Sequence, residues 1–262
     1  MGKRFAGAIL MCVLAWAGSA RADVPRAAET AYHAGNYERA VALCNADGSA
    51  AALAFAARSI IADAITRPAG FCETCLRQAI ATADQAIARD ASLVEGYLQK
   101  SVAIGFRGRV IGVSQARTEG LADEVRHLLD RAMELDPGNV WARASLGAWH
   151  LEIVHHAGSV LASVMYGASE AEGLRLFRKA LADDPDNALL QMNFALSLLA
   201  MDDDDMIPEA RRALQATTAT NSPDFLVRHA QTQARQLAEV LDRGDRETVD
   251  RLVMMFQGRT SR

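Results

Sequence analysis

Apolar residues recur along most of this chain at intervals of three and four. The clearest stripes are Leu76-Ile80-Ala83-Ile87, Leu121-Val125-Leu128-Ala132 and Leu174-Phe177-Leu181. This spacing places the apolar side chains on one face of a helix, and that face has to be buried. Strict alternation of apolar and polar residues, the pattern of a half-buried strand, is almost absent. The pattern therefore predicts an all-α fold.

The stripes and the breaks between them predict a row of helix pairs. The expected helices cover residues 25–34 and 37–45, 49–65 and 72–89, 93–106 and 119–135, 140–156 and 170–183, and 188–200 and 208–217. A closing segment near 224–256 is charged and rich in Arg and Gln, as a terminal cap facing solvent has to be. No linker-like stretch divides the chain, so we expect a single domain over residues 23–262 with C-terminal capping helices.

Two of the breaks have nearly the same sequence. Residues 136–139 read Asp-Pro-Gly-Asn, and residues 184–187 read Asp-Pro-Asp-Asn. Proline has no amide hydrogen and disfavours helical geometry in the residue before it, so each Asp-Pro ends a helix. Asn139 and Asn187 can then cap the next helix by accepting hydrogen bonds from its free amides. Each joint predicts a helix end, a tight turn and a helix start.

Around these joints the residue order resembles the tetratricopeptide (TPR) repeat. The matching residues are Ala31-Tyr32, Gly35-Asn36-Tyr37 and Ala40, then Leu146-Gly147, Phe177, Ala180 and Pro185. A standard TPR takes about 34 residues. Pro137 and Pro185 are 48 residues apart, which indicates insertions within 106–118 and 155–169. The resemblance implies a right-handed α-solenoid of antiparallel helix pairs with insertions.

A second resemblance covers most of residues 25–215 and is sharpest over 146–187. The segments that carry it are Leu146-Gly147-Ala148, Trp149-His150-Leu151-Glu152-Ile153, Val160–Gly167 and Ala171–Phe177. Their order is similar to that in the TPR-like domain of the regulator of microtubule dynamics family. That domain has a Trp-x-x-Glu helix, an amphipathic helix ending in an aromatic-Gly pair, and a Leu-x-x-Phe helix. The resemblance implies the fold and not a role on microtubules.

The N-terminus has the pattern of a secretory signal peptide. Lys3 and Arg4 precede an uncharged apolar run from Phe5 to Ala17, and Ala20-Arg21-Ala22 fits a signal peptidase site. The run is too short for an ordinary membrane-spanning helix of roughly 20 residues. We expect residues 1–22 to be a cleaved signal peptide and the mature chain to be periplasmic, with no integral membrane segment. An uncleaved anchor is the alternative.

The net charge argues against nucleic acid as a partner. The full chain has a formal net charge of −4, and residues 1–22 contain three basic and no acidic residues, so the mature chain carries −7. A general binder of nucleic acid or of anionic membranes presents a basic face instead. We expect neither as a partner.

Three cysteines follow the signal peptide: Cys44, Cys72 and Cys75. An oxidising compartment favours one disulfide and one spare thiol, and all three pairings are open from the sequence. A thioredoxin-type redox motif begins a helix after a strand, and no strand pattern precedes Cys72. We expect a structural disulfide, either Cys72 with Cys75 or Cys44 with one of them.

The densest set of ligand-type side chains is His150, Glu152, His155 and His156. Glu152 lies three and four residues before the last two, so these side chains share a helix face and could hold a metal. The order His-x-Glu-x-x-His-His is not the zinc-protease motif His-Glu-x-x-His. We expect Glu152 to make an internal hydrogen bond or ion pair, and we expect no metal or other cofactor.

Two other charged groups have both a functional and a structural interpretation. Arg107, Arg109 and Arg117 could hold a partner's carboxylate or phosphate, or they could pair with Glu119 and Asp123. The run from Asp202 to Asp205 lacks the spaced oxygens and central glycine of an EF-hand loop. We expect this run in solvent, near the positive end of the helix that Pro208-Glu209 opens.

Together these features favour a non-enzymatic scaffold that binds a partner protein or peptide on the concave face of its helix stack. The residues expected to contact the partner are Tyr97, Arg107, Arg109, Trp149, Glu152 and Tyr166. The first alternative is a small-ligand carrier, because the chain resembles exported TPR proteins associated with tripartite ATP-independent transporters. Its pocket would be lined by Val160, Leu161, Val164 and Tyr166. The apolar face of the 155–169 insertion, Ser159 to Tyr166, could form a lid over a groove, but we expect it to pack into the stack. The second alternative is a metal-dependent enzyme using His150, Glu152 and His156.

Overall fold

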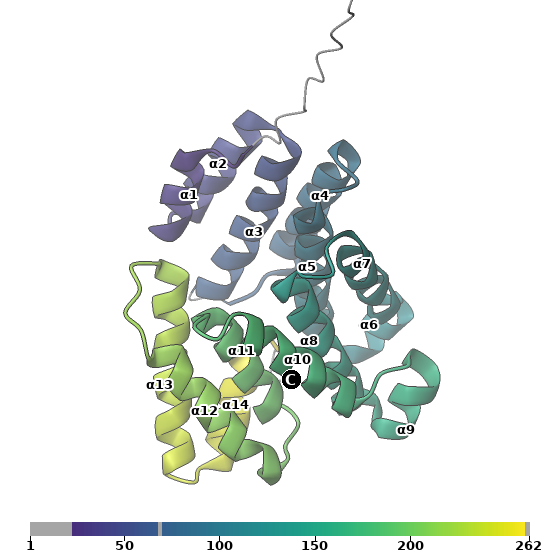
Figure 1. The fold of residues 1–262 in the computed structure, drawn as a ribbon, viewed down its shortest axis with the longest axis vertical. Coiled ribbons are helices and arrows are strands. Elements are labelled where there is room, and N and C mark those ends of the chain that lie inside the picture. The colour runs from purple at the N-terminus through teal and green to yellow at the C-terminus, as the bar shows by residue number, and fades with distance from the viewer. Residues whose placement is uncertain (1–22, 68–69, 260–262) are drawn as a thin grey trace, which may run out of the picture.

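The computed structural model describes residues 23–67 and 70–259, and within these ranges it contains helices and no strand (Figure 1). The predicted all-α class is therefore confirmed. The signal peptide expected at residues 1–22 lies outside the described residues. None of the helices in the described part of the chain is long and apolar enough to cross a membrane.

The long helices pack side by side as pairs. The first three pairs are α1 (Arg26–His33) with α2 (Tyr37–Asp47), α3 (Ala50–Thr66) with α4 (Glu73–Arg89), and α5 (Val94–Ile111) with α7 (Leu121–Leu135). The last three are α8 (Val140–Ala157) with α10 (Glu170–Asp183), α11 (Ala188–Leu199) with α12 (Ile207–Thr218), and α13 (Phe225–Asp242) with α14 (Arg246–Phe256). Each predicted helix is present, and α13 and α14 occupy the predicted closing segment.

Four short elements lie between the long helices. They are α6 (Val113–Thr118), α9 (Ser159–Leu161), the π-helix η1 (Ala162–Tyr166) and the 3-10 helix η2 (Asp204–Met206). The first three fall in the two predicted insertions. Helix α5 runs five residues past its predicted end because Ile111 is buried against Leu121. Gly112 and Gly158, with φ of +85° and +75°, then end α5 and α8, since positive φ is open to glycine at little cost.

Both Asp-Pro joints form the predicted turns. The side chain of Asn139 accepts a hydrogen bond from the amide of the third residue of α8 at 2.9 Å, and Asn187 does the same for α11 at 3.1 Å. Each Asn amide also donates back to the aspartate of its joint, Asp136 at 3.3 Å and Asp184 at 2.8 Å. Each joint therefore ties the end of one helix to the start of the next.

The first helices of successive pairs form a continuous row, which we call the inner row: α3, α5, α8, α11 and α13. Each contacts the next in this order. Helix α13 also contacts α1 and α3, so the last part of the chain returns to the first (Figure 1). The largest core cluster joins α8, α10, α11, α12, α13 and α14, with Phe177, Leu198 and Leu237 among its fully buried side chains.

Two facing glycines allow α8 and α10 to approach closely. A Cβ atom on Gly147 would lie 2.9 Å from the carbonyl oxygen of Gly173 and 3.1 Å from the backbone nitrogen of Phe177. A Cβ on Gly173 would lie 3.0 Å from the carbonyl oxygen of Gly147. Because these neighbours are backbone atoms, the helices would have to move apart to admit a larger residue.

We expect Gly147→Ala to lower the free energy of unfolding by about 1 to 3 kcal/mol, the usual cost of overpacking. Gly105→Ala is the matched control, because Gly105 lies within α5 and a Cβ there would meet nothing within 4 Å. That control should raise the free energy of unfolding by about 0.5 to 1 kcal/mol, since alanine restricts the unfolded chain. Urea denaturation measures both values, and equal effects at the two positions would contradict the close helix contact.

Candidate functional site

A pocket of about 360 Å³ opens where the first residues of α8, α11 and α13 meet the middle of α3. Its lining residues are Arg58, Trp141, Asp186, Asn187, Ala188, Leu189, Thr220, Asn221, Ser222, Asp224 and Val227. Four helices of the inner row or the connections before them therefore contribute to one cavity. Its volume lies at the lower end of the range of about 300 to 1,000 Å³ that is typical of small-molecule sites.

Arg58 is the cation of this pocket. Its Nε donates to the hydroxyl oxygen of Tyr32 at 3.3 Å, and its guanidinium lies 5.1 Å from the ring centroid of Tyr32 and 5.9 Å from that of Phe55. Burial raises the pKa of Tyr32, so this hydroxyl keeps its proton. Among the described residues, neither terminal nitrogen of Arg58 has a hydrogen-bond or ion-pair partner. The fork of the guanidinium is thus free to bind a ligand.

The start of α11 supplies further free polar groups. The carboxylate of Asp186 is exposed and has no hydrogen bond or ion pair within the described ranges. The amides of Ala188 and Leu189 are the first two of the helix, and they have no acceptor in the described part of the chain. Such amides attract negative groups, because the helix dipole is positive at this end.

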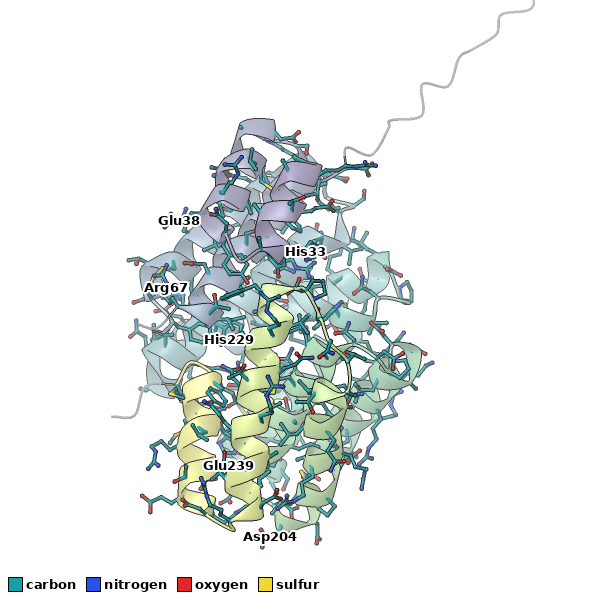
Figure 2. All side chains as sticks on the ribbon, turned by 90° about the vertical axis from the view of Figure 1, so that its left-hand side faces the viewer. His33, Glu38, Arg67, Asp204, His229 and Glu239 are labelled. Carbon is teal, nitrogen blue, oxygen red and sulfur yellow. A yellow bond between two sulfur atoms is a disulfide. The ribbon has the colours of Figure 1, made fainter. Side chains whose placement is uncertain are left out.

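Asp224, the other acid of the pocket, is already engaged. Its Oδ1 accepts from the amide of Val227 at 3.0 Å and so caps α13. Its Oδ2 lies 2.5 Å from Nδ1 of His33 at the end of α1, and Figure 2 shows His33 beside the start of α13. Next to this pair, the ring of Phe225 lies against Gly35, where a Cβ would be 2.6 Å from it. These contacts hold one wall of the pocket against the N-terminal helix pair.

A second group of charges, which we call the Glu152 cluster, joins α5, α8 and the end of the chain. Nε of Arg109 lies 2.9 and 3.0 Å from the two carboxylate oxygens of Glu152, and Nη2 of Arg259 lies 3.4 Å from Oε1. His156 Nε2 is 3.7 Å from the same carboxylate. Although burial alone would raise it, Arg109 and Arg259 hold the pKa of Glu152 well below its usual value. The cavity beside the cluster measures only about 10 Å³, so the site is filled.

Residues 257–259 cover the inner row next to the Glu152 cluster. The side chain of Gln257 donates to the carbonyl oxygen of Leu196 in α11 at 3.2 Å. Gly258 lies so close to Phe71 that a Cβ would be 2.6 Å from its ring, and Phe71 stacks on Phe106 of α5 at 4.5 Å. The C-terminal segment therefore occupies part of the surface on which a peptide partner was expected.

The residues expected to contact a partner lie on α5, α8 and η1. The structure brings together Arg109 and Glu152, which pair with each other and confirm the internal ion pair expected for Glu152. Arg107 is buried and pairs with Glu73 at 3.1 Å and with Glu119 at 2.5 Å, the second of which was predicted. Both arginines are thus engaged within the chain.

The three aromatic candidates differ in exposure. Trp149 is 6% exposed, and its Nε1 donates to the carbonyl oxygen of Ala122 at 2.9 Å. Its side chain therefore packs in the core and has little surface left for a partner. Tyr97 is half-buried and donates to the carbonyl oxygen of Ala91 at 3.0 Å. Tyr166 is half-buried against the core cluster around Trp149. The large apolar side chains before it, such as Val160 and Val164, are exposed, so the expected packing of this face into the stack is wrong for them.

The described residues contain no group of three or more His, Cys, Asp or Glu side chains arranged to hold a metal ion. His150 Nδ1 accepts from the amide of Ser169 at 3.2 Å, and His155 lies 3.3 Å from a guanidinium nitrogen of Arg259. In the acidic run, Asp202 and Asp204 pair with Arg246 at 3.1 and 3.4 Å. These histidines and acids therefore have partners within the described part of the chain.

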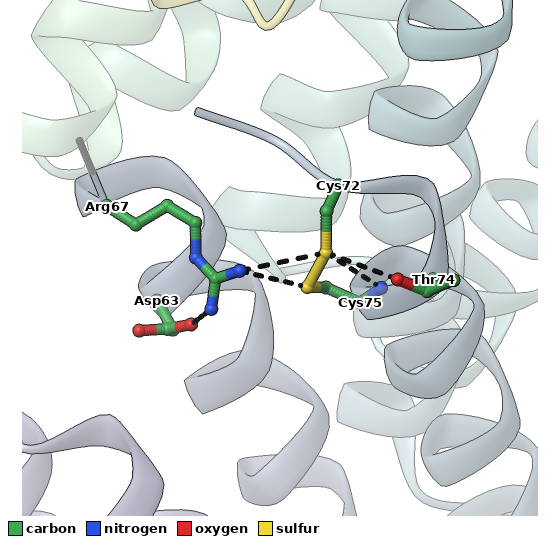
Figure 3. Close-up of a disulfide and its surroundings, with 5 residues drawn as sticks. All are labelled: Asp63, Arg67, Cys72, Thr74 and Cys75. Carbon is green, nitrogen blue, oxygen red and sulfur yellow. Dashed lines mark hydrogen bonds and ion pairs between the residues drawn. A yellow bond between two sulfur atoms is a disulfide. The ribbon is translucent and has the colours of Figure 1, made fainter. Parts of the chain in front are cut away.

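Cys72 and Cys75 form a disulfide with 5.3 Å between their Cα atoms (Figure 3). Cys44 is buried as a free thiol. Of the three pairings that the sequence leaves open, the structure thus forms the one that closes the shortest loop of chain. Cys72 precedes α4 and its sulfur accepts from the amide of Cys75 at 3.1 Å, as a helix cap does. Nη1 of Arg67 lies 3.3 Å from the sulfur of Cys75. The disulfide ties the connection after α3 to the start of α4.

The pocket around Arg58 was not predicted from the sequence. One signal was present, because Arg58 is the single basic residue in the apolar stretch 50–66, where a charge has to be placed for a reason. Its companions Trp141, Asp186 and Asp224 carry no local pattern that connects them. In comparisons with known proteins, no family model matches the chain, and no curated protein matches it.

Proposed function

We propose that this chain is a non-catalytic binding protein of the periplasm, built as a right-handed TPR-like α-solenoid, and that the pocket around Arg58 holds a small ligand. The observation that carries the proposal is the free guanidinium of Arg58 in a cavity of about 360 Å³. Tyr32 engages only Nε of the half-buried guanidinium, and among the described residues its two terminal nitrogens have no hydrogen-bond partner. Burying such donors unpaired costs free energy in the empty protein, and a bound ligand would remove that cost.

The proposed solenoid is supported by the way the helix pairs follow one another. The inner row provides a continuous line of helices from α3 to α13, as stacked pairs do, and each pair covers its neighbour's apolar face. Ligands of such arrays bind along the inner helices, and the pocket lies there. The export of the chain is supported by the sequence of residues 1–22.

A small ligand is favoured over a long peptide because the C-terminal segment covers part of the inner row. Gln257 contacts α11, Arg259 pairs with Glu152 of α8, and Gly258 lies against Phe71, which stacks on Phe106 of α5. The pocket around Arg58 lies outside these contacts. The exported TPR proteins associated with tripartite ATP-independent transporters, which this chain resembles, offer a setting in which such a carrier would act.

Native mass spectrometry of the protein purified without denaturant tests the proposal. We expect a bound small molecule, either as purified or after incubation with a small-molecule extract of the source cells. Thr220→Trp places an indole in the pocket and should abolish the adduct, whereas Arg235→Trp, on the exposed side of α13, should not. A protein that shows no adduct under either condition, or an adduct that survives in Thr220→Trp, would contradict a ligand site at Arg58.

A protein partner is the second candidate, and one observation favours it. The segment of α9 and η1 exposes four large apolar side chains, Val160, Leu161, Val164 and Met165, to between 58% and 78%. Figure 1 shows this segment projecting from the rest of the helices. Exposed apolar groups in such a cluster are typical of interaction surfaces. A photo-crosslinking residue at Val164 should give one defined protein adduct in the periplasm, and its absence would remove this candidate.

A further inference from the structure

We infer that the ligand of the Arg58 pocket is zwitterionic and of the amino-acid class, with its carboxylate on Arg58, its ammonium group on Asp186 and its apolar side chain against Trp141. This inference rests on the proposed small-ligand site and names the chemistry of its ligand. It follows from the charges that line the pocket, from which of them are free, and from the presence of Trp141 in the same lining.

The carboxylate position follows from the free donors. The two terminal nitrogens of Arg58 have no partner among the described residues, and they form the planar fork that matches a carboxylate in two parallel hydrogen bonds. The amides of Ala188 and Leu189 line the same pocket and add donors at the positive end of α11. A negative group is thus favoured from two directions.

The ammonium position follows from the acids. A ligand with negative charge alone would face two carboxylates in the same pocket, Asp186 and Asp224. Asp224 is held by His33 and by the amide of Val227, whereas Asp186 has no partner within the described ranges. Asp186 can therefore accept from a cationic group. A ligand with one positive and one negative charge satisfies both free groups, whereas a simple anion or cation satisfies one and is repelled by the other.

The rest of the pocket is small, and it combines polar side chains, Asn187, Thr220, Asn221 and Ser222, with apolar ones. Trp141, Leu189 and Val227 offer hydrocarbon surface beside the polar groups. Trp141 is half-buried, so one part of its ring stays available. The volume of about 360 Å³ accommodates an amino acid or a dipeptide and is too small for a folded partner. An amino acid whose side chain lies against Trp141, such as an aromatic one, therefore fits.

Isothermal titration calorimetry with four probes tests this chemistry on the full mature protein. L-Phenylalanine should bind. N-acetyl-L-phenylalanine lacks the ammonium group, and L-phenylalaninamide lacks the carboxylate. Each of these two should bind at least roughly tenfold more weakly than L-phenylalanine. The dipeptide L-phenylalanyl-L-alanine, which is also a zwitterion, tests whether the natural ligand is a short peptide or a free amino acid. Tighter binding of the dipeptide supports a short peptide as ligand, and weaker binding supports a free amino acid.

Two variants assign each charge to its residue. Arg58→Gln should lower the affinity for L-phenylalanine to that for L-phenylalaninamide, and it should leave the affinity for L-phenylalaninamide unchanged. Asp186→Asn should lower the affinity for L-phenylalanine to that for N-acetyl-L-phenylalanine, and it should leave the affinity for N-acetyl-L-phenylalanine unchanged. Arg235→Gln removes the same charge from an exposed position of α13 and should change none of these affinities. Asp186 is exposed, so its variant keeps the test valid even if Arg58→Gln fails to fold.

The outcomes separate the inference from the proposed function. Equal affinity for L-phenylalanine and either blocked derivative would overturn the inference that the ligand is a zwitterion. An uncharged or purely anionic molecule found by native mass spectrometry, and displaced by Thr220→Trp, would overturn it too while leaving the ligand site at Arg58 in place. Failure of both experiments to detect any small molecule would remove the inference and the proposed function together.

Discussion

Replacing Glu152 with glutamine should lower the free energy of unfolding by about 2 kcal/mol at pH 7. The substitution keeps the size of the side chain and removes its charge, which leaves Arg109 and Arg259 facing each other without a counter-charge. The side chains of Arg109 and Glu152 are only 19% and 24% exposed, so water compensates in part and the cost stays below that of a fully buried pair. Urea denaturation measures the change. Hydrogen exchange should also become faster at residues 257–259, which the cluster holds in place.

The effect of Glu152→Gln should depend on pH in one direction. The pKa of Glu152 is lower in the folded protein than in the unfolded chain, so its charge stabilises the fold above the unfolded value of about 4.3. That stability is lost as the pH falls through the folded pKa, and the difference between wild type and variant should shrink below about pH 4. Glu134→Gln is the control, because Glu134 is 66% exposed and its pairing with Arg131 contributes little. A difference that grows on acidification would contradict the ion pair.

Replacing Phe177 with alanine should lower the free energy of unfolding by about 3 to 5 kcal/mol, the range for removing a large aromatic side chain from a core. Phe177 is 1% exposed and lies 5.0 Å from the ring of Phe194. It belongs to the core cluster that joins α8, α10, α11, α12, α13 and α14. Its loss should therefore weaken all of these helices together, with a single cooperative transition at lower denaturant concentration.

Leu161→Ala is the control for this core substitution. Leu161 is 58% exposed in α9, and its replacement should change the free energy of unfolding by no more than about 0.5 kcal/mol. Phe177→Ala with a loss below about 1 kcal/mol would contradict close packing between α10 and α11. A second, separate unfolding transition would contradict a core shared by the six C-terminal helices.

The helices could be predicted because their causes are local. The apolar stripe through Leu121 and Leu128, and the Asp-Pro-Gly-Asn joint before α8, each act within a few residues. The same rules missed the end of α5, because its last turn is stabilised by contact between Ile111 and Leu121 across the α6 turn. They also missed the π-helix at 162–166, for which the sequence gives no separate signal.

The candidate site could be predicted only in part. The pairing of Glu152 was expected from its place on a helix, but its partner Arg259 is 107 residues away. The burial of Trp149 could not be predicted, because an aromatic residue at helical spacing can face the core or the surface, and only packing decides between them. The Arg58 pocket depends on the return of α13 to α1 and α3, a contact between distant segments that no local pattern encodes.

A crystal structure of the mature protein grown with saturating L-phenylalanine is the most direct measurement of the central claim, that the inner row holds a small ligand at Arg58. We predict density for the amino acid between Arg58 and Asp186, with its ring on Trp141. Two results would contradict the claim. One is density for the amino acid elsewhere, for example on the apolar segment of α9 and η1, and the other is an empty pocket in which Arg58 pairs with a carboxylate of the chain itself.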